Sequence, residues 1–74
     1  MAQTPVNVDI TGSIWKLRSK VGDNVNAGYV LLVMESMKME VEVNAPAAGV
    51  VKEIHVSEGD LVNEGDTVVT LETR

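Results

Sequence analysis

Two seven-residue segments, Gly22-Asp23-Asn24-Val25-Asn26-Ala27-Gly28 and Gly59-Asp60-Leu61-Val62-Asn63-Glu64-Gly65, decide the fold of this 74-residue chain. They share five residues at a constant offset of 37 positions. Extending the comparison without a gap to Val6–Glu35 and Val43–Glu72 gives nine identical pairs in thirty positions. Two copies are too few for a solenoid, which needs stacked neighbours. The repeat therefore predicts a closed domain of two similar halves, over residues 1–74.

The local pattern is that of short β-strands. Brief runs of Val, Ile and Leu alternate with polar residues, glycine punctuates them, and no helical period is present. This predicts an all-β chain of about eight strands. The Gly22-Asp23 and Gly59-Asp60 pairs are interpreted as turns, because glycine accepts positive φ and Asp bonds to nearby backbone. A phosphate-binding loop is the alternative, but no GxxxxGK pattern follows.

Composition excludes several classes of function. The net charge is −5, with no basic cluster of the kind that binds nucleic acid. No apolar run approaches the roughly 20 residues of a membrane span. The chain has no cysteine and one histidine, so no metal site is predicted. With 45% hydrophobic but 3% aromatic residues, the core is expected to be aliphatic. The chain is expected to be a cytoplasmic, monomeric protein or a domain cut from a larger one.

The repeat also predicts where the ends of the chain lie. Val6–Ile10 corresponds to Val43–Ala47, so the amino-terminal strand is expected beside the strand at Thr67–Glu72. Pro5 and Pro46 are expected at strand ends or edges, because proline cannot donate to a ladder. The two termini would then meet at the end of the molecule opposite Lys38.

The segment between the two repeats predicts a tight hairpin. With Met37-Lys38 as a two-residue turn, the opposed pairs are Ser36 with Met39, Glu35 with Glu40, Met34 with Val41, Val33 with Glu42, and Leu32 with Val43. One face then carries Leu32, Met34, Val41 and Val43, and the other carries Val33 and three glutamates. This agreement between turn and hydrophobic pattern puts Lys38 at the tip.

Two features of this hairpin break local rules. Two-residue turns prefer Asn-Gly or other glycine-containing pairs, and Glu35 opposite Glu40 places like charges together. Local inconsistencies of this kind occur at functional sites. In an arbitrary hairpin, Met37 and Met39 would be core residues and Lys38 a solvated charge, but its position between the repeats favours a functional lysine.

The string Glu35-Ser36-Met37-Lys38-Met39-Glu40 closely resembles the attachment site of biotinyl domains, the carriers of biotin-dependent carboxylases. The resemblance covers nearly the whole chain and implies a flattened barrel, or sandwich, of eight strands. Lipoyl domains share that fold but usually carry Asp-Lys-Ala at the turn, which favours biotin here. The ungapped repeat leaves no room for the protruding loop of some bacterial acetyl-CoA carboxylase carriers. Gly12-Ser13-Ile14-Trp15-Lys16 is similar to the urea carboxylase type.

The resemblance implies a function without catalysis by the domain itself. A biotin ligase would join biotin to the Lys38 amine, and the tethered group would then carry carboxylate between biotin carboxylase and carboxyltransferase sites. Tethering raises the concentration of the cofactor at both sites. Met37, Met39, Glu35 and Glu40 are candidate recognition residues for the ligase and the carboxylase, since methionine adapts to more than one surface. A solvated hairpin face remains the alternative for the glutamates, and core packing for Met39.

Two other functions remain open from the sequence. One is a lipoyl carrier of a 2-oxoacid dehydrogenase or glycine-cleavage system, which Met37 and Met39 disfavour. The other is an unmodified structural module, such as the similar sandwich of membrane-fusion adaptors, in which long helices usually interrupt the hairpin that is intact here. Trp15 is either a packing anchor or a docking residue.

Overall fold

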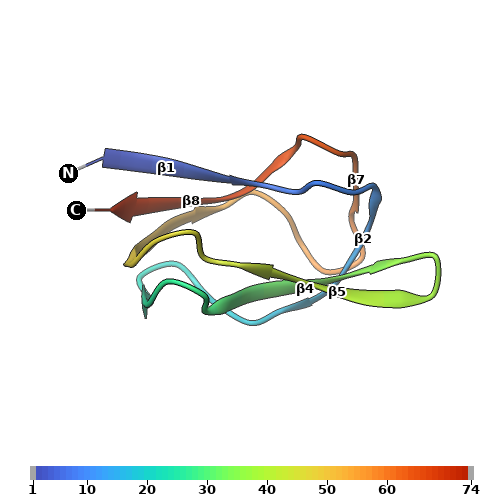
Figure 1. Ribbon diagram of the computed structural model, residues 1–74, viewed down its shortest axis with the longest axis horizontal. Helices are drawn as coiled ribbons and strands as arrows, with labels where there is room; N and C mark the ends of the chain where they lie inside the picture. Colours follow the sequence, from blue (N-terminus) through green and yellow to red (C-terminus); the bar gives the residue numbers. More distant parts are fainter. Residues whose placement is uncertain (1, 74) are drawn as a thin grey trace.

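The computed structural model describes residues 2–73, which form two four-stranded antiparallel sheets. The order in the first sheet is β1-β8-β6-β3 and in the second β5-β4-β2-β7 (Figure 1). The strands, in chain order, are β1 (Ala2–Asn7), β2 (Gly12–Leu17), β3 (Asn24–Val25), β4 (Val30–Ser36), β5 (Met39–Asn44), β6 (Gly49–Ile54), β7 (Leu61–Val62) and β8 (Thr67–Thr73). The prediction of an all-β sandwich with eight strands is confirmed.

The sequence repeat is reproduced strand by strand. Adding 37 to the bounds of β1, β2, β3 and β4 gives the bounds of β5, β6, β7 and β8. Replacing each strand of the first sheet by its counterpart 37 residues away gives the strand order of the second sheet. The breaks in strand register also repeat. Trp15 in β2 and Lys52 in β6 are left out of the pairing at equivalent places, and so are Leu31 in β4 and Val68 in β8. The quasi-two-fold symmetry therefore includes the β-bulges.

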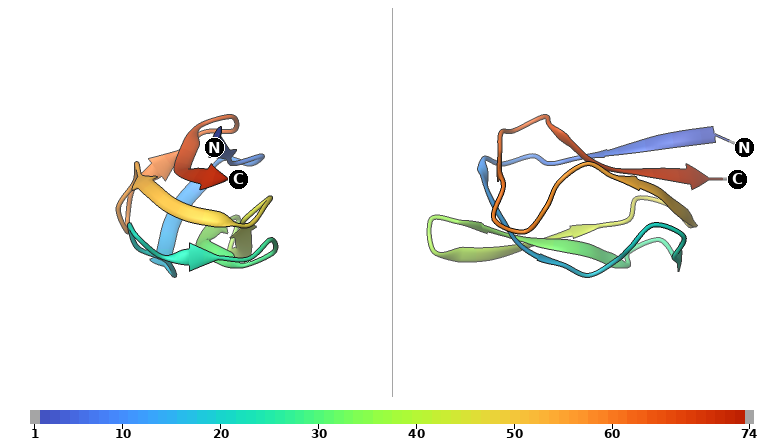
Figure 2. Two further views of the ribbon diagram at one scale, coloured as in Figure 1. Left: turned by 90° about the vertical axis from the view of Figure 1, so that its left-hand side faces the viewer. Right: turned by 180° about the vertical axis from the view of Figure 1, so that it is seen from behind.

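The two halves are interleaved rather than side by side. β1 of the first half pairs with β8 of the second, as predicted, and Figure 2 shows both termini at one end. The amino-terminal strand nevertheless lies at Ala2–Asn7, earlier than the predicted Val6–Ile10. Pro5 is tolerated inside it because β1 is an edge strand.

The Gly-Asp turns join one half to the other. The Gly22 N–H donates to the carbonyl of Val51 at 2.8 Å, and the Gly59 N–H donates to Ile14 at 2.7 Å. Both glycines have a positive φ, 98° and 95°, which side chains rarely accept. Each turn is thus hydrogen-bonded to the second strand of the other half, Gly22 to β6 and Gly59 to β2. Both copies keep glycine because this position needs a positive φ.

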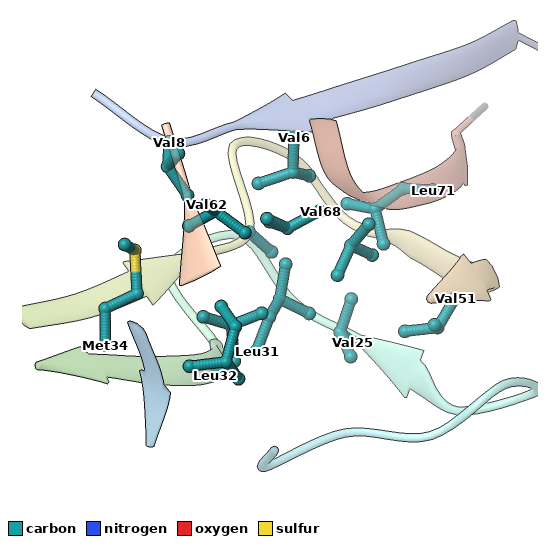
Figure 3. Packing of buried hydrophobic residues seen from close by; sticks show 13 residues of the cluster. Val6, Val8, Val25, Leu31, Leu32, Met34, Val51, Val62, Val68 and Leu71 are labelled. Atoms are coloured by element: carbon teal, nitrogen blue, oxygen red, sulfur yellow. The ribbon is translucent and has the colours of Figure 1, made fainter. Parts of the chain in front are cut away.

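The core lies between the sheets and is aliphatic, as expected from the composition. Figure 3 shows its side chains coming from both layers, with Leu31, Leu32 and Met34 opposite Val68 and Leu71. All five of these side chains are essentially inaccessible to solvent. Burying one Val, Leu or Met side chain contributes about 1.5–3 kcal/mol, so burial between the two layers stabilises the packing of one sheet on the other. No helix in residues 2–73 has the length and hydropathy needed to cross a membrane.

Candidate functional site

Lys38 lies in the turn between β4 and β5, at one end of a molecule that is 36 Å long and 18–19 Å across (Figure 1). The termini are at the opposite end. All five predicted pairs of the hairpin are present in the predicted register, from Ser36 with Met39 to Leu32 with Val43. Any group joined to this amine projects away from the rest of the domain.

The turn has an unfavourable backbone. Met37 and Lys38 have φ of 51° and 66°, and among residues 2–73 they are the only residues other than glycine with positive φ. Positive φ at both central residues characterises a type I′ turn, which suits the twist of a hairpin but favours Asn-Gly. For an L-residue, this conformation costs roughly 1–2 kcal/mol. The residues at the tip are therefore kept at the expense of stability.

The candidate recognition residues surround Lys38 and are exposed. Met37 is 93% exposed and Met39 is 67% exposed, so core packing, the alternative for Met39, is wrong. Glu35 and Glu40 are opposed and both face solvent. The structure brings all four predicted residues together around one amine, and their role in recognition remains a prediction.

Contacts at the base of the hairpin position it, and sequence reasoning did not identify them. The Ser36 hydroxyl donates to the carbonyl of Thr11 at 2.9 Å. Gly12 lies so close to β4 that a Cβ there would be 2.5 Å from the carbonyl oxygen of Glu35. The repeat did mark Gly12 as identical to Gly49, but close backbone approach is a tertiary property. These contacts hold the strands below the tip in place while leaving the tip free.

The outer face of the β4–β5 hairpin is hollowed. Trp15 and Tyr29, each nearly half exposed, line an open groove with Val33 and with Glu40 and Glu42 of β5. Val33 is buried although it shares a face with exposed glutamates, and it lies outside the central core cluster. Trp15 is thus a surface residue in the groove, whereas the sequence left its role open, and Tyr29 was not anticipated.

Among the described residues, no three His, Cys, Asp or Glu side chains are grouped as metal ligands would be. His55 Nε2 instead lies 2.8 Å from the Thr70 hydroxyl. Lys38 presents its primary amine from the exposed turn of the β4–β5 hairpin. A primary amine forms a stable amide with an activated carboxyl group.

Comparison with known proteins agrees with this geometry. Residues 4–71 match the biotin/lipoyl family model, described as "Biotin-requiring enzyme". The chain belongs to the biotin/lipoyl attachment family. It is 42% identical over 66 residues to the biotin/lipoyl attachment protein of Bacillus subtilis, covering 89% of this chain and 90% of that protein. It is 47% identical over 60 residues to the biotin carboxyl carrier protein of Streptococcus mutans, covering 81% and 46% respectively.

Two further comparisons define the range of the family. The urea carboxylase of Kluyveromyces lactis contains a domain that superposes with a TM-score of 0.92 at 35% identity, covering 97% of this chain and 6% of that one. The dihydrolipoyllysine-residue acetyltransferase component of the Pseudomonas aeruginosa pyruvate dehydrogenase complex is 44% identical over 61 residues, covering 82% and 11%. This chain thus spans less than half of the Streptococcus carrier and a small part of both larger proteins.

Proposed function

We propose that this chain is a biotin carboxyl carrier and that Lys38 is its single attachment residue. The observation that carries the proposal is the geometry of the tip. An exposed lysine lies in a strained two-residue turn, between two exposed methionines, at the end of the molecule farthest from the termini. The biotin carboxyl carrier relative and the urea carboxylase domain support biotin as the attached group.

Attachment uses Lys38 as the nucleophile. The neutral Nζ amine attacks the carbonyl of an activated biotinyl group supplied by a biotin ligase, forming an amide as the activating group leaves and Nζ loses a proton. When attached, the ureido ring of biotin accepts and releases a carboxylate group. The domain contributes position, because its rigid hairpin presents the attachment point to a carboxylating site and then to a carboxyltransferase site. The domain has no catalytic role of its own.

The experiment is intact mass spectrometry after co-expression with a biotin ligase and added biotin. We expect one biotinyl increment on the wild type and none on Lys38→Arg, which keeps the charge. Lys20→Arg is the matched control, because Lys20 is an exposed lysine next to a turn, and it should be modified like the wild type. No increment on the wild type, or an increment that persists in Lys38→Arg, would reject the proposal.

The second candidate is a lipoyl carrier, which the 44% identity to the acetyltransferase component supports. The two groups differ in mass, so the same experiment with lipoate and a lipoate ligase separates them. We expect biotin to be the preferred group, because Met37 and Met39 replace the residues usual at a lipoyl turn. The ligase as partner, the monomeric state and the cytoplasmic location remain predictions.

A further inference from the structure

The outer faces of the two sheets are related by the quasi-two-fold but differ in chemistry. On the β6–β8 face, Lys52 forms an ion pair with Glu72 at 3.7 Å, and Thr70 bonds to His55. The corresponding residues on the β2–β4 face, 37 positions earlier, are Trp15, Glu35, Val33 and Arg18. The Lys52 and Thr70 that pair with their neighbours in one half are therefore replaced by the aromatic Trp15 and the apolar Val33 in the other.

Trp15 is the bulged residue that faces the groove. The pairing of β2 with β4 skips from Ile14 to Lys16, so Trp15 is the extra residue, and bulges re-aim side chains. Lys52 is the bulged residue at the equivalent place in β6. The two positions therefore have equivalent backbone geometry, and a lysine is accepted at one of them. The fold alone does not explain why the other is a tryptophan. Tyr29 completes the aromatic end, where its hydroxyl donates to the Arg18 carbonyl at 3.3 Å.

The two faces also differ in their acidic side chains and in how these are paired. Because Trp15 replaces the cation, Glu35 lacks the partner that Glu72 has. Glu40 and Glu42 line the groove beside it, where the other half carries Gln3 and Pro5. None of these three glutamates is in an ion pair within residues 2–73. Two cations belong to the same side of the sheet: Arg18 lies at the aromatic end near Tyr29, and the exposed Lys16 is paired with Val33.

We propose that this groove is a docking surface for a carboxylase component that presents an arginine or lysine. The side chain would lie over Trp15 and pair with the carboxylates of Glu40 and Glu42, since cations bind aromatic faces and desolvated aromatic residues dominate interface energetics. The groove runs along the outer face of the β4–β5 hairpin whose turn carries Lys38, with Trp15 contributed by β2 and Tyr29 by the residue before β4. A partner held here therefore contacts the hairpin that presents Lys38. This inference rests on the proposed carrier function and names the surface by which the carrier is held.

The repeat supplies the test variants. Trp15→Lys with Tyr29→Asp gives the groove the residues of its counterpart, with which the other half already folds. Lys52→Trp with Asp66→Tyr makes the reciprocal change on the opposite face and is the matched control. Glu40→Gln with Glu42→Gln removes the charge alone. Circular dichroism and thermal unfolding establish that all three variants are folded.

The measurement is titration calorimetry with the purified biotin carboxylase and carboxyltransferase components from the same genome. The unmodified chain is used, so that the result does not depend on attachment at Lys38, which the mass experiment tests separately. We expect at least one component to bind the wild type and to bind the Trp15/Tyr29 variant about tenfold or more weakly. The Glu40/Glu42 variant should bind about threefold or more weakly at low salt, with a smaller salt dependence than the wild type. The Lys52/Asp66 variant should bind like the wild type.

Four results would overturn the proposal. The first is that neither component binds the wild type, and the second is that the wild type and the groove variants bind equally well. The third is that the control variant loses as much binding as the groove variants. The fourth is that the groove variants lose binding only to the biotin ligase, titrated in the same way. Sedimentation of the wild type adds a fifth, because self-association abolished by Trp15→Lys would make a second copy of the chain the occupant.

Discussion

Replacing Met37 by Asn should make the domain more stable while making it a poorer substrate for its ligase. Met37 has φ of 51°, and its side chain is 93% exposed. Asn accepts this left-handed conformation because its short polar side chain bonds locally. Since almost no packing is lost, relief of the backbone strain dominates. We expect a gain of about 1 kcal/mol in the free energy of unfolding, or roughly 4–8 °C in Tm for a domain of this size.

The assay is thermal unfolding followed by circular dichroism, with Met39→Asn as the control. Met39 is also exposed, but it lies in β5, where Asn is disfavoured by up to about 1 kcal/mol. The control should therefore lower the Tm. In parallel, kcat/KM for biotinylation should fall for Met37→Asn, if the ligase recognises this side chain. A Tm that does not rise for Met37→Asn, or that rises equally for Met39→Asn, would refute the argument from turn strain.

Two further predictions concern the framework. Gly12→Ala should lower the free energy of unfolding by about 1–3 kcal/mol, because the new Cβ meets the backbone carbonyl of Glu35, which cannot move aside as a side chain can. Urea unfolding measures this free energy, and an unchanged value would contradict the prediction. Joining Thr73 to Ala2 through an Asn-Gly turn in place of Arg74 and Met1 should stabilise the domain by about 2–4 kcal/mol through loop closure. Ala2 and Thr73 are paired as Met39 and Ser36 are, and Asn-Gly accepts the positive φ of such a two-residue turn. A ring lengthened by a flexible linker is the control, and a loss of stability on closure through the Asn-Gly turn would show that the two ends of the sandwich are not equivalent.

The sequence predicted the parts of this fold that depend on local pattern and on the repeat. The offset of 37 predicted the pairing of β1 with β8, and the alternation around Met37-Lys38 predicted every pair of the hairpin through Leu32 and Val43. These features follow from periodicity, which is a property of one or two strands. The position of Lys38 at the tip follows from the same arithmetic.

Features that arise from packing between strands were not predictable. The bulges at Trp15 and Leu31 shift the register where the sheets coil around the core, and no local signal marks them. The burial of Val33 on a face of glutamates depends on its surroundings across three strands. The turns at Gly22 and Gly59 each bond to a strand of the other half, and the sequence of one repeat does not predict these contacts.

The duplicated architecture separates what the fold requires from what it permits. Gly22 and Gly59 are identical because both turns need positive φ, and Gly12 and Gly49 because both strands approach a carbonyl closely. Where geometry makes the same demand twice and the residues differ, the fold is not the cause of the difference. Trp15 against Lys52 is such a pair, since both are bulged residues on equivalent strands. Both the hairpin that carries Lys38 and the groove along its outer face lie where the two halves depart from one another, so exchanging residues between halves is a direct test of which residues serve the proposed function and not the fold.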